Sequence, residues 1–380
     1  MAQSAPTNQD KQAIWQAYYK RQPTRVPMRL SSNPRVFLLN PQFNTEGYTF
    51  EQAAVDPLIH IHVSLGWQHY LRTVLNHCTD SPTGPPEVWD VSLCGYNVYE
   101  AAFFGAAVQY PEGQVPVTEP IVDDANKRDI LDFDVDHPLD NPFIQKRLAF
   151  WHEMRRICDG LTFEGRPVRL IRWLPVGTDG QVTVACNLRG GNFMLDLVED
   201  PDYAAALMDL ITRAAIRRRE ALWQYWGSDV GKSNGMADDS CEMLSARMYE
   251  KQVSPFHRAF YDAAPANLPR LMHLCGNATR HFPLMRQKLD IDSFDTGFPV
   301  DHGGLRRTLG PDVEISGGVE VVLLLNGSPN DVYERSRQIL ESGVKQGGRF
   351  IFQEANNLPP NVPLENLQAM YQACLDFGGY

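Results

Sequence analysis

The fold is decided by the stretch LMHLCGNATRHFPLMRQKLDIDSF, residues 271–294, which holds two short apolar runs with a helical segment between them. Leu271–Leu274 and Ile291–Phe294 have the length and composition of buried strands, whereas Phe282–Leu289 has the apolar spacing of a helix. The alternation continues through five further segments: a helix near Leu305–Leu309, a strand at Val313–Ile315, a helix from the Ser328 cap to about Ser342, a strand at Phe350–Phe352 and a helix at Leu364–Phe377.

Strands that alternate with helices in this way indicate βαβ units and a parallel sheet. For a chain of 380 residues, an α/β fold of the (β/α)8 TIM barrel type is the leading architecture, with residues 1–380 as a single domain. The alternative is a doubly wound open sheet. It is disfavoured because no G-x-G-x-x-G follows a first strand.

The N-terminal half has weaker patterns. Residues 1–20 form a helical extension, in which Gln9–Lys20 is amphipathic, and a short first strand is expected at Arg25–Leu30. The remaining expectations are a helix at Phe50–Asn76 that restarts at Asp56-Pro57, short strands and loops at Cys78–Asp124, a strand at Val168–Leu174, a strand-like stretch around Cys186 and Asn187, and a long helix from Asp200-Pro201 to Trp226.

Composition limits the classes of function. A net charge of -11 argues against a nucleic-acid-binding surface, which needs a basic patch. No apolar run approaches the roughly 18 residues that a membrane span needs, and no secretion signal is visible. Seven cysteines without paired spacing are typical of reduced thiols. We therefore expect a cytoplasmic protein with a small-molecule substrate.

Polar residues follow several of the apolar strand runs, where a barrel places its active site. Together they predict a polar cleft for a substrate or a metal ion. The positions are Arg29 and Arg35 after the first strand, Asp238 and Asp239 after the fourth, His273, Cys275 and Asn277 on the fifth, Asp295 on the sixth, and Gln353, Glu354, Asn356 and Asn357 after the eighth.

His273 and Cys275 form the most informative pair. Residues two apart in an extended segment point to the same side, so the imidazole and the thiolate can converge on one ion. Zinc favours such nitrogen and sulfur ligands. The alternative is a histidine bonded to a carboxylate beside an inert cysteine. Asp238-Asp239 also allows two interpretations. The pair could serve in acid/base catalysis or substrate binding, or it could lie in a solvated loop.

The chain resembles the uroporphyrinogen decarboxylase superfamily, best over residues 165–380. The resemblance rests on several separate motifs, which are Leu-Met-His273-Leu-Cys275-Gly-Asn277, Asp295 with Asp301, Ile315-Ser-Gly-Gly318, Leu-Leu-Asn-Gly327-Ser-Pro, and Asn-Leu-Pro-Pro-Asn-Val-Pro363. The superfamily also contains zinc-dependent methyltransferases that act on corrinoid proteins and coenzyme thiols. The resemblance therefore implies that the chain folds as a TIM barrel and is an enzyme.

Two branches of this superfamily are compared through their motifs. True decarboxylases carry Met-Arg-Gln-Ala-Gly-Arg-Tyr, whereas this chain has Met28-Arg29-Leu-Ser-Ser-Asn-Pro-Arg35, without the glycine. Their tyrosine corresponds to Asn187, and their catalytic aspartate has no clean match, Asp90 being the nearest. The methyltransferases use His-x-Cys-Gly as zinc ligands, which maps onto His273 and Cys275. The resemblance therefore favours the methyltransferase branch.

The same resemblance implies a site. Zinc would be held by His273, Cys275 and Asp295, and Glu354 would replace the further cysteine of the family, whose place reads Glu354-Ala-Asn356-Asn357. Asp239, Asp238 and Arg29 are expected to be catalytic. The residues expected to bind substrate are Arg35, Asn187, Asn277, Asn356 and Asn357.

The expected function is transfer of a methyl group between a small methylated compound, or a corrinoid protein, and an acceptor at this site. The alternative is metal-free decarboxylation of a carboxylated substrate. A non-catalytic barrel that binds a corrinoid is a third reading, disfavoured by the many carboxylates.

Overall fold

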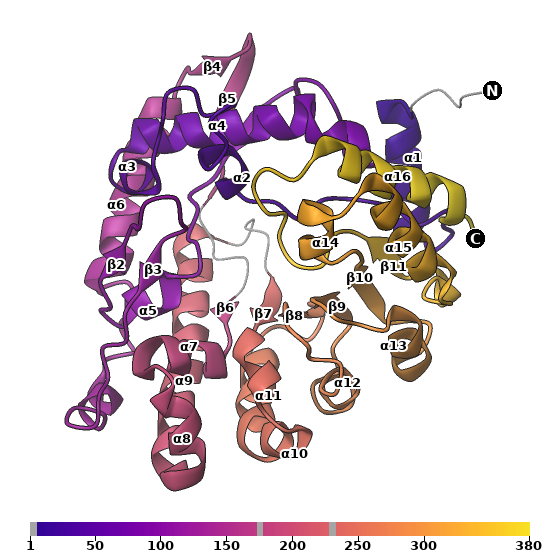
Figure 1. The fold of residues 1–380 in the computed structure, drawn as a ribbon. Coiled ribbons are helices and arrows are strands. Elements are labelled where there is room, and N and C mark those ends of the chain that lie inside the picture. The colour runs from indigo at the N-terminus through magenta and orange to yellow at the C-terminus, as the bar shows by residue number, and fades with distance from the viewer. Residues whose placement is uncertain (1–5, 173–177, 228–232) are drawn as a thin grey trace.

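The computed structural model describes residues 6–172, 178–227 and 233–380 (Figure 1). Its largest sheet has six strands in the order β11-β10-β9-β8-β7-β6, and all neighbours are parallel. These strands are β6 (Thr178–Asp179), β7 (Asn234–Ala237), β8 (Arg270–Leu274), β9 (Ser293–Thr296), β10 (Glu314–Gly317) and β11 (Phe350–Phe352). Figure 1 shows them in an arc, with helices along its outer side.

Further strands extend this arc into the TIM barrel that the sequence predicted. Met28 pairs in parallel with Phe352 and so places the first strand segment beside β11. β1 (Trp89–Val91) pairs in parallel with β5 (Arg166–Leu170), and β4 (Thr162–Phe163) pairs antiparallel with β5. β2 (Val108–Gln109) and β3 (Val117–Thr118) form a separate antiparallel pair.

The helices fall into two groups. The N-terminal group comprises α1 (Asn8–Tyr19), α2 (Arg35–Leu38), α3 (Phe50–Val55), α4 (Pro57–Thr73), α5 (Tyr99–Phe103) and α6 (Pro142–Cys158). The second group surrounds β6 to β11 and comprises α7 (Gln181–Arg189), α8 (Asn192–Glu199), α9 (Pro201–Trp226), α10 (Ala246–Met248), α11 (Ser254–Asp262), α12 (Phe282–Leu289), α13 (His302–Leu309), α14 (Val321–Asn326), α15 (Pro329–Glu341) and α16 (Leu364–Phe377).

Three predicted helix starts are confirmed. The side chain of Asp56 accepts two backbone N–H groups at the start of α4, and Asp200 accepts one at the start of α9. Each is followed by a proline, whose missing N–H costs nothing in the first turn. Ser328 and Asp331 form a capping box at the start of α15. Local sequence therefore determines where these helices begin.

The register of the strands brings polar residues to one face. His273 on β8 is paired with Asp295 on β9, and Asp295 with Ser316 on β10. Paired residues of neighbouring strands share a face of the sheet. The flanking residues of β8, Met272 and Leu274, are buried and belong to the core on the opposite face. The polar face therefore lines the interior of the barrel.

One predicted strand is a helix. Cys186 and Asn187 lie in α7, where backbone N–H groups of Val182 and Thr183 donate to Asp238, a residue far away in the sequence. The β-branched residues of this segment favour a strand locally, but this tertiary cap and packing on α9 favour a helix.

Other differences concern element ends and one short helix. β5 ends at Leu170 instead of Leu174, and Leu174 lies outside the described residues. Within Cys78–Asp124, the predicted short strands are accompanied by α5, a helix that the sequence did not predict. Across residues 6–172, 178–227 and 233–380, no helix combines the length and apolar character needed to cross a bilayer.

Candidate active site

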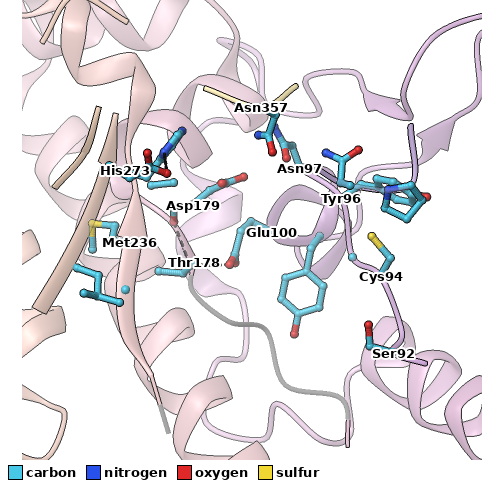
Figure 2. A pocket seen from close by; sticks show the side chains of 18 of the residues that line it. Ser92, Cys94, Tyr96, Asn97, Glu100, Thr178, Asp179, Met236, His273 and Asn357 are labelled. Atoms are coloured by element: carbon cyan, nitrogen blue, oxygen red, sulfur yellow. Dashed lines mark hydrogen bonds and ion pairs between the residues drawn. The ribbon is translucent and has the colours of Figure 1, made fainter. Parts of the chain in front are cut away.

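A cavity of about 810 Å³ opens among the carboxyl ends of the strands and reaches into the barrel (Figure 2). From the strands it is lined by Asp179, His273 and Asp295, and deeper in the barrel by Ser293 and Glu314. N-terminal segments line it as well, and Asn357 joins them from the loop after β11. The N-terminal lining residues include Arg29, Trp67, Leu93, Cys94, Tyr96, Asn97, Tyr99 and Glu100. Its volume is that of a pocket for a small organic molecule.

His273 is held in one orientation by its neighbour strand. Its Nδ1 lies 2.9 Å from Oδ2 of Asp295, and its Nε2 lies 3.9 Å from Oδ1 of Asp239. Burial lowers the pKa of His273, but bonds to Asp295 and Cys275 and the charges of Asp295 and Asp239 raise it more, to about 11. The imidazole therefore lies between two carboxylates, with Nε2 turned toward Asp239.

Cys275 follows β8 and lies beside the same carboxylate. Its backbone N–H donates to Oδ1 of Asp239 at 2.7 Å. Burial raises the pKa of the Cys275 thiol, and the neighbouring His273 lowers it. A Cβ at Gly297 would lie 1.8 Å from the carbonyl oxygen of Cys275, so only glycine permits this close packing of the two segments.

The ligand atoms of Asp239, His273 and Cys275 lie within 4.8 Å of one another. Three protein ligands of this kind, with a fourth position left for substrate, are the donor set of catalytic zinc sites. A carboxylate that accepts from the other nitrogen of the histidine, as Asp295 does here, is the usual support for such a ligand. The residues present thus fit a zinc ion.

This arrangement differs from the metal set expected from the sequence. Asp239, expected to be catalytic, is the carboxylate beside His273 and Cys275, and Asp295 instead supports the histidine. Glu354 belongs to neither of the two groups of potential ligands that the described residues form, which are Asp239, His273 and Cys275 and the buried Asp238, Cys241 and His257. It is buried and accepts the backbone N–H of Ser31, and burial raises its pKa to about 8.

Gln353 joins Arg29 to this site, a role that the sequence did not predict. It is fully buried, its Oε1 accepts from Nε of Arg29 at 2.8 Å, and its Nε2 donates to Oδ1 of Asp295 at 2.7 Å. A chain of hydrogen bonds thus runs from Arg29 through Gln353 and Asp295 to His273. Its position after β11 was visible in the sequence, but its partners were not.

Asp238 has a different environment from Asp239. It is fully buried and accepts from the backbone of Val182 and Thr183, from the hydroxyl of Thr183 and from Nε2 of His257. Burial raises the pKa of Asp238, but these hydrogen bonds and the interaction with His257 lower it by more, so the pKa lies below its usual value. Asp238 therefore holds α7 against the end of β7 and does not line the cavity.

The residues expected to bind substrate are dispersed. Asn357 lines the cavity, whereas Asn187 is half-buried on α7 and Asn277 is exposed. Asn356 has a φ of 80° and accepts weakly from Asn357 at 3.4 Å. Arg35 donates to the backbone carbonyl groups of residues 357 and 358, so it supports this loop. Asp90 forms an ion pair with Arg169, away from the cavity lining.

Three acidic residues that line the cavity, Glu100, Asp179 and Glu314, were not predicted from the sequence. Glu100 is buried, pairs with Arg218 and accepts the hydroxyl of Thr178 at 2.5 Å. Asp179 lies nearer to His273 in Figure 2. The sequence signal for Asp179 was its place at the end of a strand before Gly180, but the strand prediction ended upstream at Leu174.

The chain is similar in sequence to known methyltransferases. The methylated-thiol–coenzyme M methyltransferase of Methanosarcina mazei is 31% identical over 195 residues, 50% of this chain and 50% of that protein. The methylcobamide:CoM methyltransferase MtbA of Methanosarcina acetivorans is 24% identical over 203 residues, 52% of this chain and 56% of that protein. The chain thus spans about half the length of the curated relatives it matches.

A solved structure described as a methyltransferase from Methanosarcina mazei shares the fold, with a TM-score of 0.64 at 18% identity over 98% of this chain and 99% of that one. Residues 95–377 match the family described as uroporphyrinogen decarboxylase (URO-D). Because this match spans most of the chain, the protein belongs to the URO-D family, and its curated relatives place it nearer the coenzyme M methyltransferases than true uroporphyrinogen decarboxylase.

Proposed function

We propose that the protein is a methyltransferase that passes a methyl group from a small methylated compound, or from a corrinoid protein, to an acceptor at Asp239, His273 and Cys275. The observation that carries this proposal is the convergence of these three side chains, with Asp295 behind the histidine. The methyltransferase relatives support it. Corrinoid would be supplied by the partner protein or the substrate.

The chain's own residues would hold and orient the reactants. Asp239, His273 and Cys275 would bind a zinc ion, which when bound keeps a substrate thiol deprotonated near neutral pH. Asp295 and Gln353 fix the imidazole so that Nε2 faces the metal position. Arg29 lines the cavity while its Nε is held by Gln353, which leaves its terminal nitrogens to position an anionic part of the substrate.

The alternative, decarboxylation, draws less support from these contacts. It needs two arginines to bind substrate carboxylates, but Arg35 donates to backbone carbonyl groups of the 357–358 loop. Of the two carboxylates that could stabilise positive charge in a decarboxylase, Asp238 is fully buried, and Asp239 lies beside His273 and Cys275. Methyl transfer therefore remains the function that the arrangement supports best.

The first test is the zinc content of protein purified without chelator. We expect close to one zinc per chain in the wild type and a large loss in Cys275→Ser. Cys94→Ser is the matched control, because Cys94 is a thiol of the same cavity outside the ligand group. A wild type that stays metal-free after zinc supplementation would contradict the zinc site, and absence of methyl transfer to thiol or cob(I)alamin would contradict the function.

A further inference from the structure

The interior of the barrel below His273 is lined mostly by small or polar side chains. Strand pairing places Gly235 of β7, Leu271 of β8, Ser293 of β9 and Glu314 of β10 side by side, and we call these four residues the lower layer. On β8 this layer lies two residues before His273, so Leu271 and His273 point to the same side of the sheet. The interior of a TIM barrel is commonly filled by bulky branched side chains, and of these four residues only Leu271 has one.

The lower layer borders an open space instead of a packed core. All four of its residues line the cavity of about 810 Å³. Leu271 keeps 37% of its surface exposed, although it faces the inside of the barrel. Covering an exposed apolar side chain with an apolar part of a ligand is favourable. The space below His273 is therefore suited to the organic part of a substrate.

Glu314 lies at the deep end of this space. Its Oε2 accepts from the hydroxyl of Tyr18 and from Nη2 of Arg349, both at 2.7 Å, so α1 and the residue before β11 hold it in place. Its Oε1 accepts from the hydroxyl of Ser293 at 3.0 Å. Because the Ser293 proton is used in this bond, the serine oxygen can only accept a further hydrogen bond. The lower layer therefore offers acceptors, and a ligand that binds there must bring the donor.

The spacing and shape of the lower layer indicate an aromatic ring. Residues two apart on a strand are separated by about 6.6 Å, which is close to the separation of two para substituents on a benzene ring. A ring with one substituent beside His273 thus places the opposite substituent at the level of Ser293. Gly235 has no side chain, so the face of a ring can approach the strand backbone there. A rigid ring also loses less conformational freedom on binding than a flexible chain.

We propose that the methyl donor is an aromatic compound with its methyl group on a heteroatom at one end of the ring and a hydroxyl group at the other. This inference rests on the proposed methyl transfer. The ring occupies the lower layer between Gly235 and Leu271, and its hydroxyl donates to Oγ of Ser293. Ser293 thus determines specificity through the end of the substrate opposite to the methylated atom.

The test measures binding by isothermal titration calorimetry with 4-(methylthio)phenol and with methyl phenyl sulfide, which lacks the hydroxyl. We expect the wild type to bind the phenol about tenfold more tightly, and Ser293→Ala to reduce this preference to less than about threefold. Ser92→Ala should keep the preference. It is the matched control because Ser92 also lines the cavity but lies far from His273 in it (Figure 2). Ser293→Leu fills the lower layer and should weaken the binding of both compounds.

Several outcomes would overturn the inference. Equal binding of the two compounds by the wild type, or an unchanged preference in Ser293→Ala, would remove the role of Ser293. Methyl transfer from dimethyl sulfide without binding of either aromatic compound would remove the inference and leave the proposed function intact. Binding of the phenol without methyl transfer to cob(I)alamin or a thiol would contradict the proposed function, and with it the role of the ligand as donor. If Ser293→Leu does not fold, the comparison of the two ligands on the wild type and Ser293→Ala still decides.

Discussion

Nδ1 of His273 lies 2.9 Å from Oδ2 of Asp295, its register partner on the adjacent strand. This bond turns Nε2 toward Asp239 and Cys275, so the orientation of the proposed ligand is set by the pairing of β8 with β9. The other oxygen of Asp295 accepts from Gln353, which in turn accepts from Arg29. The site is therefore supported from three separate segments of the barrel.

Asp295→Asn tests this support. The amide keeps the size of the side chain but removes its charge, and loss of such a partner weakens metal affinity about 10- to 100-fold. We expect zinc affinity, measured by competition with a chromogenic chelator, to fall by this factor while the circular dichroism stays unchanged. Asp312→Asn, an exposed position, is the control. An unchanged affinity would show that Asp295 does not support the ligand.

Gln353→Ala tests the buried hydrogen-bond chain. The substitution leaves Nε of Arg29 and Oδ1 of Asp295 without this partner, which costs about 1–3 kcal/mol for a buried group. We expect the free energy of unfolding in urea to fall by that amount. The exposed Gln372→Ala should change it by less than about 0.5 kcal/mol. Equal effects of the two substitutions would contradict the proposed chain.

Glu354→Gln tests the buried carboxyl group that accepts from Ser31. Its pKa is raised by burial to about 8, from about 4.3 in an unfolded chain, so the folded state binds the proton more tightly. Its contribution to stability is therefore present at low pH and is lost as the pH rises from about 4.3 to 8. We expect the glutamine variant to gain stability relative to the wild type across this range, as measured by urea unfolding at several pH values. A difference independent of pH would contradict the raised pKa.

Asp238→Asn tests the attachment of α7. The carboxylate is fully buried and accepts hydrogen bonds from Val182, Thr183 and His257, and an amide in its place leaves part of this buried set unsatisfied, which costs about 1–3 kcal/mol. Because the folded pKa of Asp238 is lowered, its contribution is present above about pH 3.9 and is lost as the pH falls below it. We expect the variant to be destabilised at neutral pH, with a smaller difference in acid. Asp209→Asn, on the exposed side of α9, is the control.

Much of the fold could be predicted from local sequence. Caps such as Asp200-Pro201 and Ser328–Asp331 lie next to the helices they begin, so a short window contains the interaction. The alternation of apolar runs from Leu271 onward predicted the parallel strands in the same way. The α7 segment was mispredicted because its cap, Asp238, lies 56 residues from Val182.

The sequence by itself determined that His273 and Cys275 share one side of a strand end, because that relationship is set by backbone geometry over three residues. Only the tertiary structure decided which carboxylate joins them. Asp239 meets them because β7 and β8 pair in the register that places Ala237 beside His273. Asp295 supports the histidine because β8 and β9 pair in the register that places His273 beside Asp295. Strand register depends on the packing of the whole barrel, and no local pattern of residues contains it.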